Sequence, residues 1–149
     1  FLFNQQISAR IAARLFETVL DGDVLQLDGS GSVFRATEAL APLQQRLTES
    51  DVHITAVLAG LGEPMVSARA AEFEQQVLSQ HSELLNGLID YRLKAERRAI
   101  RLMPQQMQLQ QDGNDICLSF ALGAGCFATS VLRELVDYRD CGRKFSDKE

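Results

Sequence analysis

The feature that most constrains this chain is a break near its middle, the run Gly-Leu-Gly-Glu-Pro at residues 60–64. Glycine adds backbone freedom, whereas proline removes an N–H and fixes φ, so together they interrupt helices and strands. Segments with regular apolar patterns lie on both sides of the break. We therefore place a domain boundary there, with residues 1–62 as one part and residues 63–149 as the other.

Before the break, the apolar pattern changes between helical and strand spacing. Apolar residues recur at every fourth position from Phe3 to Val19, which places them along one side of a helix. The Gly-rich turn at residues 28–32 separates two short apolar runs, as in a hairpin. In order, the expected elements are a helix over residues 3–19, strands over 24–27 and 33–35, a helix over 37–47 and a buried strand over 54–58.

After the break, a helix-rich segment gives way to strand alternation. Residues 66–98 are expected to be helical, with an interruption near Asn86-Gly87 because glycine costs a helix interior about 1 kcal/mol. Between residues 100 and 120, alternating apolar residues on both sides of a Gln-Asp-Gly-Asn turn predict a β-hairpin. Pro104 favours an edge or bulged position, since proline has no N–H for the ladder. A last amphipathic helix is expected over residues 127–136.

Composition narrows the class of protein. The chain is 46% apolar and 23% charged, as soluble globular proteins are, and it has no apolar run of the roughly 18–20 residues that a membrane span needs. Its three cysteines, Cys117, Cys126 and Cys141, form no C-x-x-C pair and have no paired histidines nearby. This pattern argues against a zinc site or a disulfide framework and suits a reducing, cytoplasmic location. The lack of a first methionine suggests that residue 1 is not the natural start.

A cationic cluster occupies residues 92–101 and contains Arg92, Lys94, Arg97, Arg98 and Arg101. If a helix continues through this segment, the last four share one face that would suit a phosphate backbone. Lys94, Arg97 and Arg98 are therefore candidate RNA-binding residues. The alternative is a solvated face near a helix C-terminus, where cations offset the helix dipole. The net charge of −5 argues against binding nucleic acid by bulk attraction, but a basic face can exist on an acidic protein.

The remaining polar motifs point to structure more than to chemistry. His53 and His81 have no Ser, Cys or carboxylate partner at a recognisable spacing, which favours structural roles over catalysis. Asp21 and Asp23 flank a glycine as in a cation-binding loop. An EF-hand loop that began at Asp21 would need glutamate at its twelfth position, which is Ser32 here. A helix end followed by a turn explains the two aspartates better.

The segment at residues 123–129 runs through small residues into a helix that has Phe127 in its first turn. Small residues allow a close approach to the backbone, and an exposed aromatic ring can stack on a base. The pattern alone favours a core role for Phe127 over a binding role.

Five segments match, in order and in spacing, the pattern of one known family. They are Phe3-Asn4-Gln5 with Arg14-Leu15, Asp21-Gly22-Asp23-Val24-Leu25-Gln26-Leu27, Ile54-Thr55-Ala56 before Gly60-Leu61-Gly62-Glu63, Arg97-Arg98-Ala99 before Pro104-Gln105-Gln106, and Gly125-Cys126-Phe127-Ala128-Thr129-Ser130-Val131-Leu132-Arg133-Glu134-Leu135. On these residues the chain resembles the TruD family of tRNA pseudouridine synthases over about 90% of its length. The last segment is the most specific.

The resemblance implies an α+β fold. Residues 1–62 would be the C-terminal part of the TRUD insertion domain, and residues 63–149 the C-terminal part of the pseudouridine synthase catalytic domain. It also implies a reaction, the isomerisation of uridine 13 in the D arm of tRNA to pseudouridine, with tRNA as partner and without a metal or an organic cofactor. The target base must leave its stack to be reached. The position that matches the family's uracil-pocket phenylalanine is Phe127.

The chain departs from the family pattern in ways that matter for its chemistry. The family's nucleophilic aspartate lies in a Gly-x-Lys-Asp-Lys-x-Ala segment, and these 149 residues contain no such segment. No catalytic residue is therefore expected here, and the chain is expected to be an inactive piece of the enzyme. Gly123 stands where the family has proline, and Cys126 where it has serine. The alternative is a non-catalytic remnant of the scaffold that binds RNA or a partner protein.

Overall fold

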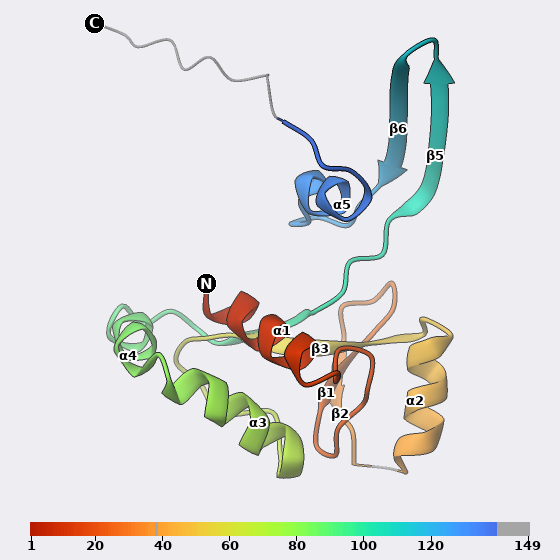
Figure 1. The fold of residues 1–149 in the computed structure, drawn as a ribbon. Helices are drawn as coiled ribbons and strands as arrows, with labels where there is room; N and C mark the ends of the chain where they lie inside the picture. The colour runs from red at the N-terminus through yellow and green to blue at the C-terminus, as the bar shows by residue number, and fades with distance from the viewer. Residues whose placement is uncertain (38, 140–149) are drawn as a thin grey trace, which may run out of the picture. The chain divides into compact units, whose positions relative to one another are not determined.

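A computed structural model describes residues 1–37 and 39–139 of the chain. The chain divides into two compact units, residues 1–101 (unit 1) and residues 102–149 (unit 2). The elements, in chain order, are α1 (Leu2–Ala12), β1 (Val24–Leu27), β2 (Val33–Arg35), α2 (Leu40–Thr48), β3 (Val52–Leu58), α3 (Ala68–Ser79), α4 (Ser82–Asp90), β4 (Glu96–Ala99), β5 (Gln105–Asp112), β6 (Asp115–Ala121) and α5 (Ala128–Leu135) (Figure 1). This mixture of helices and antiparallel strands confirms the α+β class.

Unit 1 is built on a four-stranded antiparallel sheet with strand order β2-β1-β3-β4. The central strands β1 and β3 are rich in β-branched and aliphatic residues, which suit a pleated, buried surface. Leu25 of β1 lies opposite both Phe34 of β2 and Ile54 of β3. The strands predicted over residues 24–27, 33–35 and 54–58 are thereby confirmed.

Side chains on the two faces of β1 belong to different hydrophobic clusters. Leu25 packs with Leu43 and Leu47 of α2, whereas its neighbour Val24 packs with Ala70 of α3. Successive side chains of a strand point to opposite faces, so consecutive apolar residues signal a strand that is covered on both sides. The centre of the sheet of unit 1 is therefore covered by helices on both faces.

The turn at residues 21–23 is fixed to the start of α3. The Ser67 N–H donates to the Gly22 carbonyl and the Ala70 N–H to the Asp21 carbonyl, both at 3.0 Å. Gly22 has φ +78°, and a Cβ at this position would lie 2.0 Å from the Ser67 carbonyl oxygen. The predicted turn is confirmed, and only glycine fits its centre without a shift of the backbone.

Three predicted helical boundaries are wrong. The first helix ends at Ala12 and not at Val19, because Arg14 takes a left-handed conformation with φ 58°. The break in the region from 66 to 98 falls between α3 and α4, whereas Gly87 lies inside α4. Residues 96–99 are not helical but form β4, which pairs with β3.

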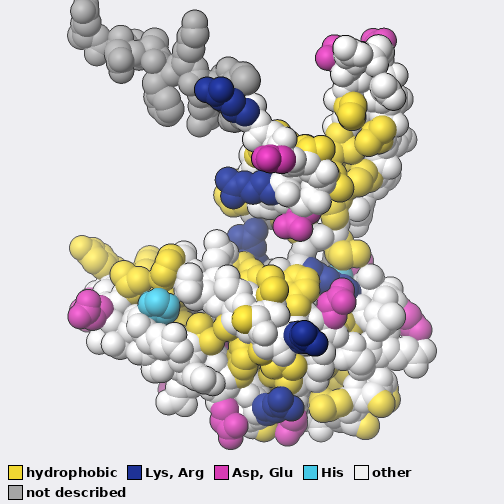
Figure 2. Space-filling model, in the orientation of Figure 1, with side chains coloured by type: hydrophobic (Ala, Val, Ile, Leu, Met, Phe, Trp, Pro, Cys, Tyr) yellow, Lys and Arg dark blue, Asp and Glu magenta, His cyan; other side chains and the backbone are white. Residues whose placement is uncertain are grey.

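Unit 2 contains the predicted hairpin and the predicted last helix. β5 and β6 pair around the turn at Gly113-Asn114, with Leu109 opposite Leu118 and a register irregularity between Gln105 and Gln108. Val131 of α5 is buried. Figure 2 shows hydrophobic side chains gathered along the hairpin. Many of these side chains are exposed: Met107 (43%), Leu109 (67%) and Ile116 (66%).

The domain boundary that we placed at residues 62 and 63 stays a prediction. Residues from both sides of it pack together in unit 1, where Val57 of β3 pairs with Arg97 of β4. Cys117 and Cys126 are free thiols, and Cys141 lies outside the described residues. None of the helices in the described ranges is long and apolar enough to span a lipid bilayer.

Candidate functional site

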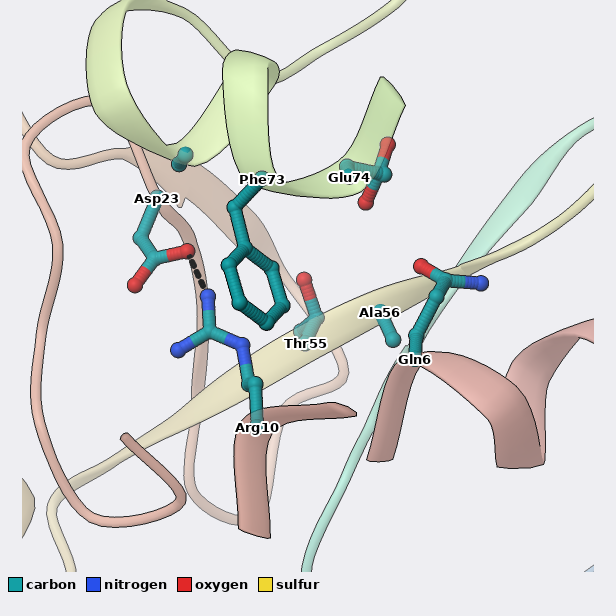
Figure 3. A pocket seen from close by; sticks show the side chains of 8 residues that line it. Gln6, Arg10, Asp23, Thr55, Ala56, Phe73 and Glu74 are labelled. Carbon is teal, nitrogen blue, oxygen red and sulfur yellow. Dashed lines mark hydrogen bonds and ion pairs between the residues drawn. The ribbon is translucent and has the colours of Figure 1, made fainter. Parts of the chain in front are cut away.

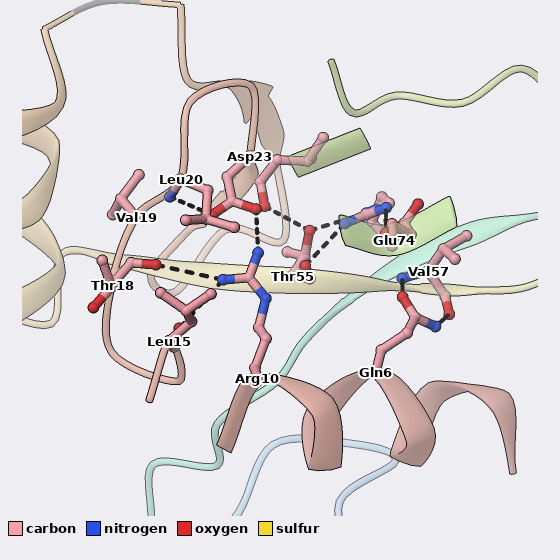
Figure 4. A network of polar contacts seen from close by, with 12 residues as sticks. Gln6, Arg10, Leu15, Thr18, Val19, Leu20, Asp23, Thr55, Val57 and Glu74 are labelled. Atoms are coloured by element: carbon pink, nitrogen blue, oxygen red, sulfur yellow. Dashed lines mark hydrogen bonds and ion pairs between the residues drawn. The ribbon is translucent and has the colours of Figure 1, made fainter. Parts of the chain in front are cut away.

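A buried ion pair joins α1 to the turn before β1. A guanidinium nitrogen of Arg10 donates to Asp23 Oδ1, and the side chains are only 6% and 1% exposed (Figure 4). The Leu20 N–H donates to Asp23 Oδ2 at 2.8 Å. Burial raises the pKa of the Asp23 carboxyl above its usual 3.8, and the charge of Arg10 partly offsets this effect.

A second buried ion pair joins β4 to α3. Arg97 Nη1 donates to Glu74 Oε2 at 2.7 Å, and the side chains are 4% and 13% exposed. Arg97 also donates from Nε to Thr55 Oγ1 at 3.0 Å and from Nη2 to the Thr55 carbonyl at 2.8 Å. Thr55 Oγ1 in turn donates to the Val24 carbonyl at 2.6 Å. Arg97 therefore connects β4, β3, β1 and α3.

Arg10 and Asp23 of the first ion pair and Glu74 of the second line one small cavity, shown in Figure 3. Its volume is about 10 Å³, which is room for about one water molecule. Within residues 1–37 and 39–139, every buried side-chain nitrogen and oxygen has a hydrogen-bond partner. The network therefore fixes the packing of helices on the sheet, and its cavity is too small for a nucleotide.

His53 lies in a third polar cluster, between Asp28 and Arg101. Arg101 Nε donates to His53 Nδ1 at 2.9 Å, so Nδ1 accepts and the proton is on Nε2, which donates to Asp28 Oδ1 at 2.8 Å. Arg101 Nη2 also donates to the Leu47 carbonyl at 2.8 Å, and burial lowers the pKa of Arg101. His81 packs edge-on against Phe1, with ring centroids 5.2 Å apart. Both histidines thus have the structural contacts that the sequence favours.

The predicted basic face does not exist in the form we expected. Lys94 precedes β4, while Arg97 and Arg98 are consecutive in β4 and so point to opposite faces of the sheet. The shared helical face is therefore wrong, because pairing with β3 makes this segment a strand. Arg97 is engaged internally, Arg98 lies over the ring of Phe3 at 5.7 Å, and Lys94 is exposed. Their contacts with RNA stay a prediction.

Phe127 is the residue before α5 and has an extended backbone, with φ −111° and ψ 120°. Its side chain is 67% exposed. The core role that the pattern alone favours is therefore wrong for this chain. The ring can present a face to a ligand, and its role in a uracil pocket stays a prediction.

Sequence reasoning missed the buried Arg10–Asp23 pair. A signal for it exists in α1, where Gln6 and Arg10 follow Leu2 at intervals of four residues and all three are buried. Polar residues that lie in line with a buried apolar one need internal partners. Gln6 finds them on β3, because its Nε2 donates to the Val57 carbonyl at 2.9 Å.

In the residues that the structure describes, no three His, Cys, Asp or Glu side chains come together in a way that could hold a metal ion. Asp23, one of the two aspartates of the 21–23 turn, pairs with Arg10. The buried polar groups of unit 1 are thus arranged to stabilise the fold.

Comparison with known proteins gives the same family as the sequence motifs. A family model described as tRNA pseudouridine synthase D (TruD) matches residues 1–135. A tRNA pseudouridine synthase D from Colwellia psychrerythraea is 39% identical over 99% of this chain and 43% of its own length. Those from Photobacterium profundum and Aeromonas salmonicida are 42% and 43% identical, over 91% and 99% of this chain and 39% and 42% of theirs.

One solved structure supports the fold. It is that of a candidate tRNA pseudouridine synthase D (TruD) from Methanosarcina mazei, with a TM-score of 0.69, 24% identity, and coverage of 89% of this chain and 35% of that one. The fold is thus the α+β fold of that structure. The family model places the chain among proteins related to RNA-modifying isomerases. The chain belongs to the tRNA pseudouridine synthase D (TruD) family, and it spans 39–43% of the length of the curated relatives named above.

Proposed function

We propose that the protein containing this chain is a tRNA pseudouridine synthase that isomerises uridine 13 in the D arm of tRNA and works in the cytoplasm. The observation that carries the proposal is the family match over residues 1–135, together with relatives of 39–43% identity that are named for this activity. The exposed ring of Phe127, within the most specific matching segment, is consistent with a substrate contact.

In the proposed reaction, the C–N glycosidic bond of the uridine breaks and a C–C bond to the same ribose forms, without a net oxidation or reduction. The uracil must turn while it stays bound, so the pocket has to hold a planar ring and still allow it to rotate in its own plane. A flat aromatic side chain does this by stacking, which is tolerant of rotation in the plane. This is the role that we propose for Phe127.

We further propose that the nucleophilic aspartate is supplied by a part of the protein outside these 149 residues. The chain lacks the Gly-x-Lys-Asp-Lys-x-Ala segment, and Asp23, the aspartate that is buried among the described residues, is paired with Arg10. Incubation of unmodified tRNA with the full-length protein should give one new pseudouridine in the D arm. The chain of residues 1–149 alone should give none, and any turnover by it would falsify this assignment.

The role of Phe127 is tested in the full-length protein. Phe127→Ala should lower kcat/KM by about fivefold to a hundredfold, the range expected for one lost stacking contact, whereas Phe127→Tyr should keep most of the activity. Phe1→Ala is the matched control, because Phe1 is another phenylalanine with a comparable exposure of 71%. Equal activity of Phe127→Ala and the wild type would remove Phe127 from the site.

Of the candidate RNA-binding cations, Lys94 and Arg98 can be replaced in a binding test, whereas Arg97 cannot. Lys94→Gln and Arg98→Gln should each weaken tRNA binding for all sequences alike and reduce its salt dependence, by up to about one unit of slope per lost phosphate contact. Arg97 is unsuitable for this test, because its replacement would leave Glu74 buried without its partner. Affinities that do not change in either variant would contradict the proposed contacts.

The second candidate function is a non-catalytic remnant that binds RNA or a partner protein. The observation that favours it is that the conspicuous charged groups of unit 1 form structural ion pairs. The two candidates differ in the sequence outside this chain. A Gly-x-Lys-Asp-Lys-x-Ala segment there, together with pseudouridine formation, supports the enzyme, whereas tRNA binding without pseudouridine formation supports the remnant.

A further inference from the structure

The segment after α4 exposes an aromatic ring to solvent. Tyr91 is 84% exposed, the highest value among the large apolar side chains of the described residues. It follows directly on the last residue of α4, the helix drawn at one edge of unit 1 in Figure 1. A ring exposed to this extent contributes little to the core, and its faces are accessible to a ligand.

This segment is held rigidly by its backbone. The Tyr91 N–H donates to the Gly87 carbonyl at 3.1 Å, and the Leu93 N–H donates to the Leu88 carbonyl at 3.1 Å. On the other side, the Leu61 N–H donates to the Leu93 carbonyl at 2.6 Å and Leu61 accepts from the Ala95 N–H at 3.0 Å. The ring is thus presented from a fixed backbone, which lowers the entropy cost of binding a ligand.

The loop after β3, which contains Gly60, also limits the movement of this segment. A Cβ added at Gly60 would lie 2.2 Å from the Leu93 carbonyl oxygen, so the two backbones are in close contact. Arg92, between Tyr91 and Leu93, has φ 54°, a left-handed conformation that is unfavourable for arginine. Arg92 is the first residue after the C-cap of α4, where a left-handed residue commonly ends a helix, so its conformation fixes the direction in which the chain leaves α4.

Two cations closely follow the tyrosine in the sequence. Arg92 and Lys94 are both exposed, and their Cα atoms are within about 11 Å of that of Tyr91 because they are one and three positions further along the chain. Asp90 and Glu96 lie at the two ends of the segment and weaken its positive potential. The cations are therefore suited to individual phosphate contacts and not to a broad attraction.

We propose that Tyr91 stacks on an unpaired base of tRNA while Arg92 and Lys94 contact the adjacent phosphates. The proposal rests on the proposed function for its ligand class and adds a contact outside the uracil pocket. An aromatic face with neighbouring cations is the combination that binds single-stranded nucleic acid, where bases are free to stack and phosphates lie close by. An unpaired loop or end of the tRNA meets this requirement, whereas a base inside a duplex does not.

The observations favour RNA over a protein partner. Leu61 and Leu93 are also half exposed beside the segment, at 52% and 50%, and an apolar partner could cover them. The charged residues on both sides of Tyr91 would then have to lose water without gaining partners, which is unfavourable. For RNA, the same cations gain phosphates and stay partly solvated.

The test measures binding of tRNA transcripts to the full-length protein by fluorescence anisotropy at two salt concentrations. Tyr91→Ala should weaken binding by about fivefold to a hundredfold, and Tyr91→Phe should bind like the wild type. Arg92→Asn should weaken binding and lower the salt slope by about 0.7. Asparagine is chosen because it tolerates the left-handed backbone. Arg14→Asn is the matched control, since Arg14 is also an exposed arginine with positive φ, at 58°.

Each outcome decides the proposal. Circular dichroism first establishes that every variant keeps the fold. Wild-type affinity in Tyr91→Ala, or an equal effect of Arg14→Asn and Arg92→Asn, overturns the proposal. Pseudouridine formation by the full-length protein judges the proposed function separately. If Tyr91→Ala abolishes self-association or capture of a protein but leaves tRNA binding unchanged, the segment is a protein-docking site and the proposal is wrong.

Discussion

The ion pair between Arg10 and Asp23 is the residue-scale contact whose loss should cost most. Removal of one partner leaves the other charge buried without compensation, so Arg10→Met and Asp23→Leu should each lower the free energy of unfolding by about 3–5 kcal/mol. The double variant should cost clearly less than the sum, and urea unfolding of all four proteins measures this coupling. Arg46→Met is the control, because the Arg46–Asp51 pair is exposed at 38% and 54% and should contribute under about 1 kcal/mol. Additive effects at the buried pair would contradict this account.

The same pair predicts a pH dependence. Burial raises the pKa of Asp23 and Arg10 lowers it, so Arg10→Met should raise it further. A folded-state pKa above the unfolded value means that stability is fully present below the unfolded pKa, near 3.8, and is lost as the pH rises through the folded pKa. The destabilisation by Arg10→Met should therefore be smallest in acid and grow toward neutral pH. Urea unfolding over this range checks the sign, and a penalty that shrinks with rising pH would refute it.

Alanine substitutions at Gly22 and Gly29 distinguish the cost of steric crowding from the cost of backbone strain. Both glycines have positive φ, at 78° and 70°, but only at Gly22 would a Cβ meet backbone, 2.0 Å from the Ser67 carbonyl oxygen. Gly29→Ala should cost about 1–2 kcal/mol, the usual penalty for a left-handed conformation. Gly22→Ala should cost clearly more, because the turn must also leave the start of α3. Thermal unfolding compares the two variants, and equal midpoints would show that this contact is unimportant.

At the scale of elements, the sequence predicted those strands that show an alternating pattern within their own residues. The strands over 24–27, 33–35 and 54–58 and the hairpin of β5 and β6 follow from alternation and turn residues, and all are present. The end of α1 does not follow from local apolar spacing. Arg10 donates to the carbonyls of Leu15 and Thr18 at 3.4 Å, and these hydrogen bonds stabilise a non-helical path for the residues after α1. β4 was missed for a related reason. Its composition suits a helix, and only pairing with β3, some 40 residues away, makes it a strand.

The hairpin of β5 and β6 has one apolar face that the described residues leave exposed. Leu109 pairs with Leu118 and Gln111 with Ile116, so Leu109, Leu118 and Ile116 share that face. An exposed apolar face on a two-stranded sheet favours association. Leu109→Lys should therefore reduce self-association of the chain in analytical ultracentrifugation. Gln110→Lys adds the same charge on the opposite face and should have little effect. If both variants behave alike, net charge and not the apolar face controls association.

For the whole molecule, the sequence motifs identified the family but not the surroundings of the candidate site residues. The segment that contains Phe127 carries a specific local pattern, and the family model confirms the resemblance over residues 1–135. The setting of the cations depends on partners that are distant in the sequence. Arg97 contacts Glu74 and Thr55, which are 23 and 42 residues away. No local pattern distinguishes such an internal arginine from a surface one.

The two units should differ strongly in stability. Every fully buried apolar side chain of the described residues except Val131 lies in unit 1, while unit 2 consists of a two-stranded hairpin and one short helix. Burial of apolar side chains is the main source of stability, and two-stranded sheets are at best marginally stable in water. Hydrogen exchange on the chain of residues 1–149 should therefore show strong protection in β1 and β3 and weak protection in β5 and β6. A chain of residues 1–101 should keep the protection of β1 and β3, because their partners β2, β4 and α2 all lie within it. Loss of that protection in the shorter chain would mean that unit 1 depends on unit 2 for its fold.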